Sequence, residues 1–314
     1  MTIPYTGLGL DRATDRRADP AWVAARAADG RARVWPLWRD QCLVAGDPPV
    51  PVELAAGAAG GLDAAGGLDP AGLVLLGLAG DVPYFTADLS GLAPADALAR
   101  AGADAAADIR SLFSGLPADQ AGILAYARGL LYWHRQQRYC GRCGSAAELR
   151  HAGHLRACTN GECGALIFPR IEPAVITLVE TGTRPRRCLL ARHRASTAGR
   201  YSLLAGFLEQ GESLEDAVRR EIFEESGVAL SDVRYVGSQP WPFPAGLMVA
   251  FQATAAGESI SVDGNEIVEA RWFTRAELRE YEQAQGQLGR VDSIDRVLVG
   301  AWLAGGDQGP HSRG

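Results

Sequence analysis

The stretch GFLEQGESLEDAVRREIFEESGV, residues 206–228, places carboxylates on one side of a predicted helix. Glu221 and Glu225 are one helical turn apart, and Glu224 is three residues from Glu221, so the side chains share one face. Like charges at this spacing destabilise an isolated helix, and partial burial strengthens the repulsion. A hard divalent cation with oxygen ligands would offset it. The alternative is a solvated acidic helix face, and the glutamates alone do not decide between the two.

The residues around the glutamates predict where this helix begins and ends. Ser213 is suited to cap the N-terminus with Asp216 as its capping-box partner, and Gly227 follows the last turn as a C-cap. Gly206 and Gly211 bracket the preceding loop, where the backbone can approach a ligand closely. The apolar face is formed by residues at helical spacing: Leu214, Ala217, Val218 and Ile222.

Every defined position of the Nudix box, G-x5-E-x7-R-E-U-x-E-E-x-G-U with U a bulky aliphatic residue, is matched by this stretch. The matching residues are Gly206, Glu212, Arg220, Glu221, Ile222, Glu224, Glu225, Gly227 and Val228. The chain therefore resembles the Nudix hydrolases, which split a diphosphate linked to another moiety. We expect Glu212 and Arg220 to hold the loop and the helix together by an ion pair.

The resemblance implies a catalytic Mg²⁺ or Mn²⁺ site on this helix. Glu221 and Glu225 are the expected ligands, together with the carbonyl of Ala205. Glu224 is expected as a further ligand or as the general base, and which glutamate takes the proton of water varies within the superfamily. A carboxylate outside the box often completes the site, and Glu266 is the candidate here; an exposed loop acid is the alternative.

The composition is that of an ordinary globular protein, with 47% hydrophobic and 22% charged residues. A length of 314 residues favours two domains. The net charge of −6 argues against broad, non-specific nucleic-acid binding, which needs a basic surface. The N-terminus has no apolar segment of the signal-peptide kind, and the longest apolar run, 71–79, is too short to span a bilayer. We expect a cytoplasmic protein without membrane association.

A second motif is formed by cysteines in two close pairs. Cys140 and Cys143 are spaced C-x2-C, and Cys158 and Cys163 are spaced C-x4-C. In a cytosolic chain such clustering favours a metal over disulfides, and four thiolates suit one tetrahedral, structural Zn²⁺ per chain. The alternative is four unrelated cysteines. The remaining two cysteines are expected to be small core residues: Cys42 and Cys188.

The run Ser238–Pro244, SQPWPFP, resembles the signature of the NADH pyrophosphatases of the NudC type. Alternating prolines and aromatics form a stiff segment that can present flat rings to a base or a nicotinamide. A proline-rich connector that buries two aromatics is the alternative. The resemblance implies substrate contacts by Gln239, Pro240, Trp241, Pro242, Phe243, Pro244, Ala245 and Gly246. Gly246 stands where the signature usually has Ser.

The same resemblance implies three substrate contacts elsewhere in the chain. Phe168 would stack on a base, although the family often has Tyr at this position. Asp295 would contact the substrate through its backbone, and Arg110 would supply a basic contact. The two departures from the family pattern, at Phe168 and Gly246, affect fine substrate preference rather than the reaction.

We expect an α+β protein with four parts. Residues 1–137 form an NADH-pyrophosphatase-like domain with a linker helix, 138–170 a zinc ribbon, 171–304 a Nudix α/β/α sandwich with a mixed sheet, and 305–314 a disordered tail. Residues 55–67, nearly all Gly and Ala, should be a mobile loop. Predicted strands are 73–78, 82–86, 174–180, 187–191, 233–238, 247–254 and 269–273, with a strand–turn–strand at 34–44; predicted helices are 118–137 and 292–303.

The resemblance implies hydrolysis of NAD(H) to nicotinamide mononucleotide and AMP, removal of the NAD cap from RNA, and a homodimer. One rival interpretation is a Nudix hydrolase of another nucleoside diphosphate such as ADP-ribose, which the Trp-Pro-Phe run disfavours. A rival of another class is a zinc-ribbon nucleic-acid-binding regulator with an inactive Nudix domain. The intact glutamates and the acidic balance disfavour it.

Overall fold

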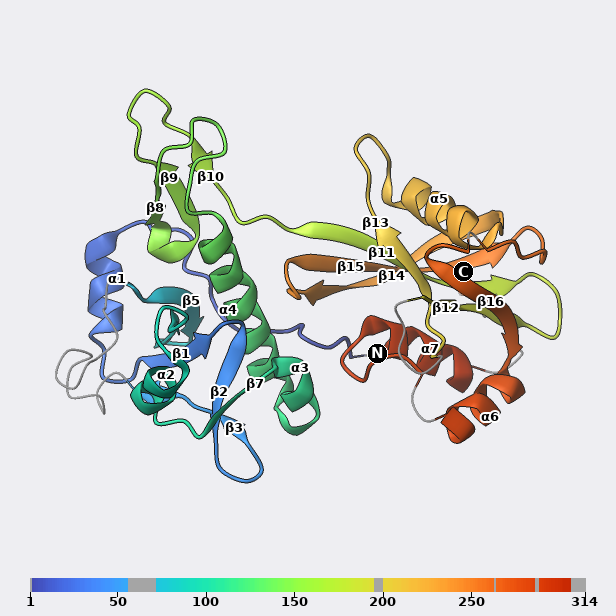
Figure 1. The fold of residues 1–314 in the computed structure, drawn as a ribbon, viewed down its shortest axis with the longest axis horizontal. Coiled ribbons are helices and arrows are strands. Elements are labelled where there is room, and N and C mark those ends of the chain that lie inside the picture. Colours follow the sequence, from blue (N-terminus) through green and yellow to red (C-terminus); the bar gives the residue numbers. More distant parts are fainter. Residues whose placement is uncertain (1, 56–71, 195–199, 263, 286–287, 306–314) are drawn as a thin grey trace. The chain divides into compact units, whose positions relative to one another are not determined.

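The structure is a computed structural model, and it describes residues 2–55, 72–194, 200–262, 264–285 and 288–305. The predicted loop at 55–67 and the predicted tail at 305–314 lie, apart from Ala55 and Gly305, outside the described residues. Two compact units are present (Figure 1). The N-terminal unit comprises Tyr5–Ile171 and Pro242–Ala245. The C-terminal unit comprises Met1–Pro4, Glu172–Trp241 and Gly246–Gly314.

A mixed sheet forms the centre of the N-terminal unit, in the order β3-β2-β1-β6-β5, with β4 paired to β1 and β7 to β2. The strand–turn–strand predicted at 34–44 and the strands predicted at 73–78 and 82–86 are confirmed. The strands are β1 (Arg33–Trp38), β2 (Gln41–Ala45), β3 (Val50–Pro51), β4 (Leu54–Ala55), β5 (Val74–Ala79), β6 (Val82–Asp88) and β7 (Ala105–Ala107). The helices are α1 (Pro20–Ala27), α2 (Pro94–Ala101), α3 (Ile109–Leu112) and α4 (Ala118–Gln136), and α4 is the predicted linker helix.

The cysteine-bearing segment forms a small sheet in the order β10-β9-β8, made of β8 (Ala147–Arg150), β9 (Leu155–Cys158) and β10 (Leu166–Ile167). Two histidines connect it to the rest of its unit: His134 is buried and His154 half-buried. Nε2 of His134, on α4, donates to the carbonyl of Gly153 at 2.6 Å, and Nε2 of His154 donates to the carbonyl of Leu75 at 2.7 Å. Burial lowers the pKa of both imidazoles to about 4, so they are neutral at neutral pH.

The C-terminal unit contains a sheet in the order β14-β15-β11-β12-β16, with β13 paired to β11. Its long central strand β11 (Glu172–Thr181) runs parallel to β15 (Gly246–Ala255) and antiparallel to its other neighbours, so the sheet is mixed. The remaining strands are β12 (Arg187–His193), β13 (Leu204–Phe207), β14 (Leu230–Trp241) and β16 (Ile267–Thr274). The mixed sheet predicted for this part of the chain is therefore confirmed.

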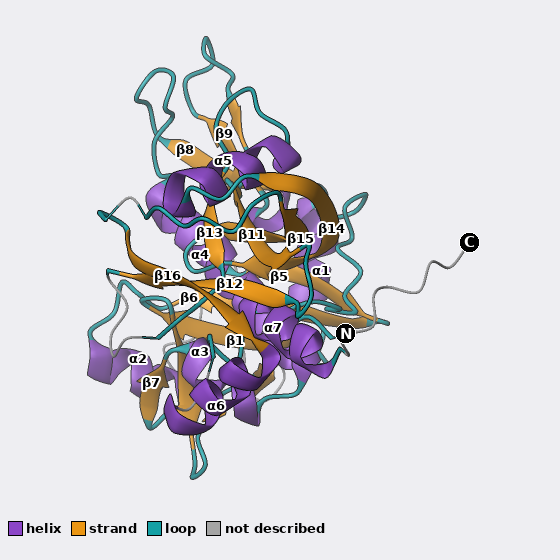
Figure 2. Ribbon diagram, turned by 90° about the vertical axis from the view of Figure 1, so that its right-hand side faces the viewer, coloured by secondary structure: helices purple, strands orange, loops and turns teal. Residues whose placement is uncertain are grey.

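Helices cover both faces of this sheet (Figure 2). Helix α5 (Leu214–Ser226) buries Ala217, Val218 and Ile222 in one apolar cluster. Helix α7 (Ile294–Ala304) buries Leu298, Val299 and Trp302 in another, alongside α6 (Arg275–Gln285). The predicted α/β/α sandwich is confirmed, and Cys188 is a buried core residue of it.

Strand β11 has two partners along one edge. Ala174–Thr177 pairs with β13, and Val179–Glu180 pairs with β12. Strand β13 leads directly through the glycine-rich loop to α5, so the sheet fixes where that loop starts. Strand β14 runs three residues further than the 233–238 segment predicted, through Trp241. Among the described residues, no helix combines the length and the apolar content that a bilayer crossing needs.

Candidate active site

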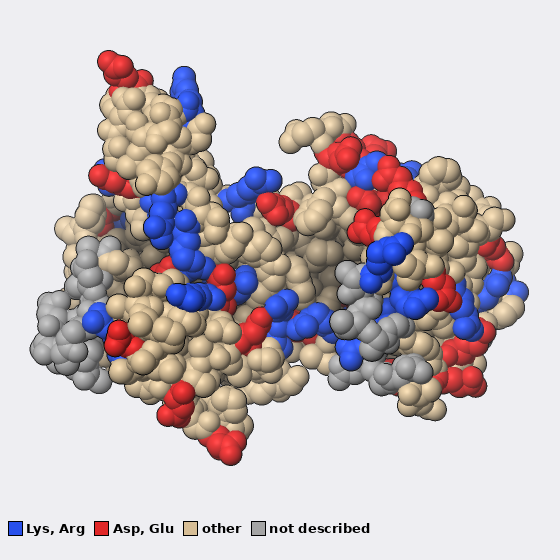
Figure 3. All heavy atoms as spheres, viewed as in Figure 1, with Lys and Arg blue, Asp and Glu red and all other residues tan. Residues whose placement is uncertain are grey.

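Helix α5 begins and ends as the sequence predicts. The hydroxyl of Ser213 accepts from the amide of Asp216 at 3.1 Å, and the Asp216 carboxylate accepts from the amide of Ser213 at 3.3 Å. Gly227 takes the left-handed conformation, φ 70°, just after the last turn. The apolar face packs against the sheet, and the three glutamates differ in burial: Glu224 is exposed, Glu221 half-buried and Glu225 buried. In the space-filling view, acidic side chains gather over α5 with basic ones among them (Figure 3).

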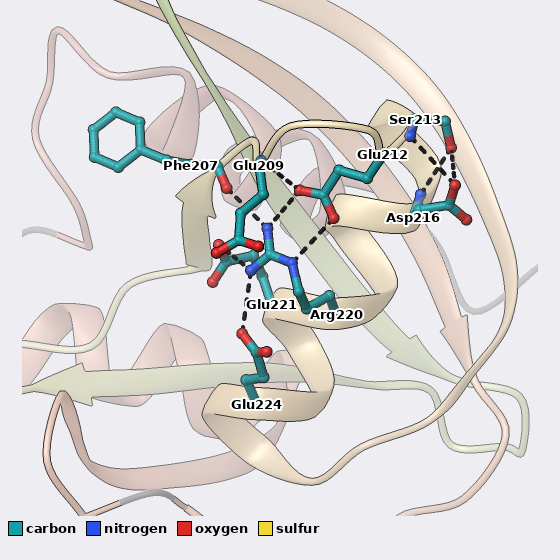
Figure 4. Close-up of polar contacts among 8 residues, drawn as sticks. All are labelled: Phe207, Glu209, Glu212, Ser213, Asp216, Arg220, Glu221 and Glu224. Carbon is teal, nitrogen blue, oxygen red and sulfur yellow. Dashed lines mark hydrogen bonds and ion pairs between the residues drawn. The ribbon is translucent and has the colours of Figure 1, made fainter.

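Arg220 is the centre of a polar network between this helix and the loop before it (Figure 4). Its guanidinium donates to both carboxylate oxygens of Glu212, at 3.0 and 2.6 Å, and to the carbonyl of Phe207 at 2.9 Å. It also donates to Glu221 at 2.9 Å and to Glu224 at 3.1 Å. The predicted pair of Glu212 and Arg220 is confirmed. The hydrogen bonds that the Glu212 carboxylate accepts from Arg220 lower the pKa of Glu212 and raise the pKa of Arg220.

Gly206 allows the backbone of β13 to lie directly against the carboxylate of Glu221. A Cβ atom at position 206 would lie only 1.9 Å from Cδ of Glu221. Ala205 is the residue before Gly206 in β13, where it pairs with Ile176 of β11. Burial raises the pKa of Glu221, the hydrogen bond from Arg220 opposes the rise, and repulsion from Glu224 and Glu266 adds to it. The loop therefore forms a cradle around one carboxylate.

A second cluster joins Glu225 and Glu266 with a histidine that the sequence reasoning missed. The ligand atoms of His193, Glu225 and Glu266 all lie within 4.8 Å of one another. Glu225 is buried, His193 half-buried and Glu266 exposed. His193 lies just past the strand predicted at 187–191, and the box motif contains no signal for it. The carboxylates around α5 are oxygen donors of the kind that Mg²⁺ and Mn²⁺ take, so the residues fit such a cation.

The cysteine cluster is fully assembled. The distance between the Sγ atoms of Cys140 and Cys163 is 3.9 Å, and between those of Cys143 and Cys158 it is 3.4 Å. All four sulfurs lie within 4.8 Å of one another. Sulfurs bound tetrahedrally at about 2.3 Å from zinc would be separated by about 3.8 Å. The predicted cluster of four thiol ligands is consistent with a structural zinc site.

Gln239, a predicted substrate contact, has its side chain engaged inside the C-terminal unit. It is fully buried; its Nε2 donates to the carbonyl of Asp292 at 2.8 Å, and its Oε1 accepts from the amide of Ile294 at 2.7 Å. These bonds fix the start of α7. Asp295 is also buried, and its Oδ1 accepts from the amide of Leu203 at 3.3 Å. Burial raises the pKa of Asp295 to about 6.

Phe243 and Arg110, predicted separately as substrate contacts, lie together in the N-terminal unit. The Arg110 guanidinium lies 5.2 Å from the centre of the Phe243 ring, and that of Arg128 lies 4.9 Å from it. Arg128 also donates to the carbonyl of Pro242. The ring of Tyr5 completes the group, 5.5 Å from that of Phe243. Phe243 is therefore held by cations and an aromatic ring.

The other predicted contacts are distributed over both units. Phe168 is 66% exposed and available for stacking, and Trp241 is half-buried at the end of β14. Gly246 pairs with Trp241 across the hairpin, where a Cβ atom would lie 3.0 Å from the Trp241 carbonyl oxygen. Pro240 and Pro242–Ala245 occupy the end of β14 and the turn that follows it. Phe207, which the sequence reasoning did not single out, is 62% exposed one residue after the cradle glycine (Figure 4).

The capped acidic helix, the glycine cradle and the arginine network together define a Nudix hydrolase site. Comparison with known proteins agrees, because the NUDIX domain family matches residues 170–293. The NADH pyrophosphatase-like rudimentary NUDIX domain family matches residues 31–133. The NAD-capped RNA hydrolase NudC of Deinococcus radiodurans is 38% identical over 207 residues, which are 66% of this chain and 71% of that protein. The chain belongs to the NudC-type NADH pyrophosphatase branch of the Nudix hydrolase family.

Two further relatives have the same kind of name. The NAD-capped RNA hydrolase NudC of Mycobacterium bovis is 41% identical over 209 residues, covering 63% of this chain and 66% of the relative. The human NAD-capped RNA hydrolase NUDT12 is 44% identical over 167 residues, covering 51% of this chain. That alignment spans only 36% of the human protein.

Proposed function

We propose that this protein hydrolyses the diphosphate bond of NAD(H), giving nicotinamide mononucleotide and AMP, and removes the NAD cap from RNA 5′ ends. The observation that carries the proposal is the Glu221 carboxylate held against Gly206 of β13, on the same helix as Glu225, whose ligand atom lies within 4.8 Å of that of Glu266. The names of the relatives support NAD-type substrates. The proposed location is cytoplasmic and the proposed oligomer is a homodimer, as expected from the resemblance.

In this proposal the helix and its loop hold Mg²⁺ or Mn²⁺. Glu221, Glu225, Glu266 and the Ala205 carbonyl are the proposed ligands, with Glu224 as a further ligand or as the general base. A bound divalent cation neutralises the charge of the diphosphate and makes water a better nucleophile. One carboxylate accepts a proton from water while the water oxygen attacks one phosphorus of the diphosphate. The bond to the bridging oxygen breaks, and the other half of the substrate leaves as a nucleoside monophosphate. Arg220 keeps Glu221 and Glu224 in position through its hydrogen bonds.

Recognition of the dinucleotide is assigned to groups outside the helix. Trp241 and Phe168 are the proposed stacking residues. Pro240 and Gly246 belong to the same signature as Trp241 and are proposed as further substrate contacts. Phe243, Arg110 and the turn Pro242–Ala245 are proposed to act through the cation–aromatic group that they form. Gln239 is proposed to act indirectly, by fixing the backbone at the start of α7. Asp295 is proposed to contact the substrate through its own backbone. The structural zinc on Cys140, Cys143, Cys158 and Cys163 is proposed to maintain the segment that carries Phe168.

The test is incubation of the full chain with NADH, NAD⁺, ADP-ribose or NAD-capped RNA, in Mn²⁺ or in Mg²⁺, with products separated by chromatography. We expect nicotinamide mononucleotide and AMP from NAD(H), and nicotinamide mononucleotide from the capped RNA. A matched preparation of the Glu225→Gln variant controls for contaminating hydrolases. Cleavage of ADP-ribose without cleavage of NAD(H) would assign the site to another nucleoside diphosphate. Absence of any cleavage would refute the proposal.

A further inference from the structure

His193 lies at an irregular position in the sheet. Along β12, Arg192 pairs with Glu269 of β16, yet the next residue, His193, pairs with Ile267, so the register shifts between them. Such a bulge changes the direction of a side chain relative to a regular strand, and bulges often occur next to active sites. Here it accompanies an imidazole that lies beside two acidic side chains rather than among the apolar residues of the sheet.

The spacing of these groups suits a shared cation. Ligand atoms bound at about 2.1 Å to one ion are about 3.0 Å apart at right angles and about 4.2 Å apart on opposite sides. The donor atoms of His193, Glu225 and Glu266 lie within 4.8 Å of one another. Binding one ion would require the donor atoms to move together by at most about 1.8 Å, the difference between 4.8 Å and the separation of about 3.0 Å at right angles.

The backbone that carries Glu266 is held in place by the residue after His193. The amide of Arg194 donates to the Glu266 carbonyl at 2.8 Å, and its Nε donates to the Asn265 carbonyl at 2.8 Å. Its guanidinium also donates to the carbonyl of Gly264. Glu225 comes from the rigid helix α5 and is only 5% exposed. The three donors are therefore supplied by elements whose positions are fixed before a cation arrives.

We propose that His193 is a nitrogen ligand for a divalent cation that it shares with Glu225 and Glu266. This inference rests on the proposed hydrolase function and specifies the cation. Mg²⁺ is bound through oxygen, whereas imidazole is a ligand for first-row transition ions. One nitrogen among oxygens favours Mn²⁺ over Mg²⁺ at this position. The competing role for His193 is to position Glu225 or Glu266 by a hydrogen bond, without touching the cation.

The experiment measures Mn²⁺ binding to the zinc-loaded full chain without substrate. Electron paramagnetic resonance counts bound Mn²⁺, and electron spin-echo modulation detects nitrogen bonded to it. We expect a nitrogen coupling in the wild type and its loss in His193→Gln. We also expect Mn²⁺ affinity to fall about 10-fold or more, as loss of a group supporting a metal site does. Mg²⁺ affinity, measured by competition, should change less than about 3-fold, because an oxygen-selective ion gains little from imidazole.

The control is His151→Gln, which removes an exposed histidine of the N-terminal unit and should leave the coupling intact. Absence of nitrogen coupling in the wild type overturns the proposal without any variant, even if His193→Gln does not fold. Persistence of the coupling in a folded His193→Gln protein, or equal losses of Mn²⁺ and Mg²⁺ affinity, also overturns it. Because no substrate is present, failure to hydrolyse NAD(H) would leave this measurement interpretable.

Discussion

Replacing Gly206 by alanine tests the cradle around Glu221 directly. The added Cβ would lie 1.9 Å from Cδ of Glu221, and 2.1 and 2.2 Å from its carboxylate oxygens. Ordinary contacts of this kind begin near 3.4 Å, so the carboxylate and the strand must separate by about 1.5 Å. Arg220 holds the same carboxylate at 2.9 Å, so this movement also disturbs the network. A misplacement of about 1 Å can reduce catalysis about 100-fold, and we expect a fall in kcat of at least that size.

The assay is steady-state NADH hydrolysis at saturating Mn²⁺, accompanied by a thermal melt and a Mn²⁺ titration. Gly257→Ala is the matched control, since a Cβ at residue 257 meets nothing within 4 Å in the same unit. The control should retain wild-type kcat, whereas Gly206→Ala should lose turnover and Mn²⁺ affinity together. If folded Gly206→Ala keeps kcat within about 3-fold of wild type, the carboxylate is not held where we place it.

Three further results are expected. Glu225→Gln should reduce turnover at least about 100-fold while the thermal melt stays near that of wild type, because a metal ligand is lost and the fold is kept; near-normal turnover would contradict the assignment. Metal analysis should find about one tightly bound zinc per chain, and no zinc in the double variant Cys140→Ser, Cys143→Ser. Wild-type protein without zinc would contradict the assignment of the four thiolates as ligands. Burial raises the pKa of Asp295 to about 6, so the wild type loses stability as pH rises from about 4 through 6. Asp295→Asn keeps an oxygen that accepts from the amide of Leu203 and has no charge to bury, so it should lose less stability over this pH range. Calorimetry should therefore give it a higher Tm than wild type at pH 7.5. Equal Tm values at every pH would rule out a penalty from burying this carboxylate.

The box helix was predictable because its determinants are local. Ser213, Asp216 and Gly227 act within a few residues of the helix ends, so their bonds follow from sequence spacing. The same holds for the cysteine pairs, whose short spacings restrict how they can be arranged. The bond between Glu212 and Arg220 spans eight residues and was predictable only through the family pattern.

Groups that meet through the sheet were not predictable in the same way. His193 reaches Glu225 and Glu266 because β12 pairs with β16 through a register shift, and no local pattern encodes that shift. The buried role of Gln239 depends on bonds to residues 53 and 55 positions away along the chain. The resemblance implied a substrate contact for Gln239, whereas its side-chain amide donates to the carbonyl of Asp292 and accepts from the amide of Ile294 at the start of α7.

The extension of β14 has a clear physical reason. The predicted strand ended at Ser238, two residues before Pro240, and proline lacks the amide that a central strand needs. In the structure β14 is at the edge of its sheet, with β15 as its one neighbouring strand. An edge strand tolerates proline, because no strand on its outer side requires an amide donor. Pro240 pairs with Leu247, and Trp241 with Gly246, before the chain turns. The aromatic signature is therefore half strand and half turn.

The assignment of short segments to opposite units has a consequence for how the protein is made. Pro242–Ala245 belongs to the N-terminal unit, although 70 residues of the C-terminal unit, Glu172–Trp241, precede it in the chain. During synthesis the N-terminal unit cannot acquire the Phe243 group until the ribosome has passed residue 245. The C-terminal unit likewise includes Met1–Pro4, which emerges first. A cut between Ile171 and Glu172 would leave each product without a segment of its own fold, so we expect fragments expressed separately to be less stable than the same units within the whole chain.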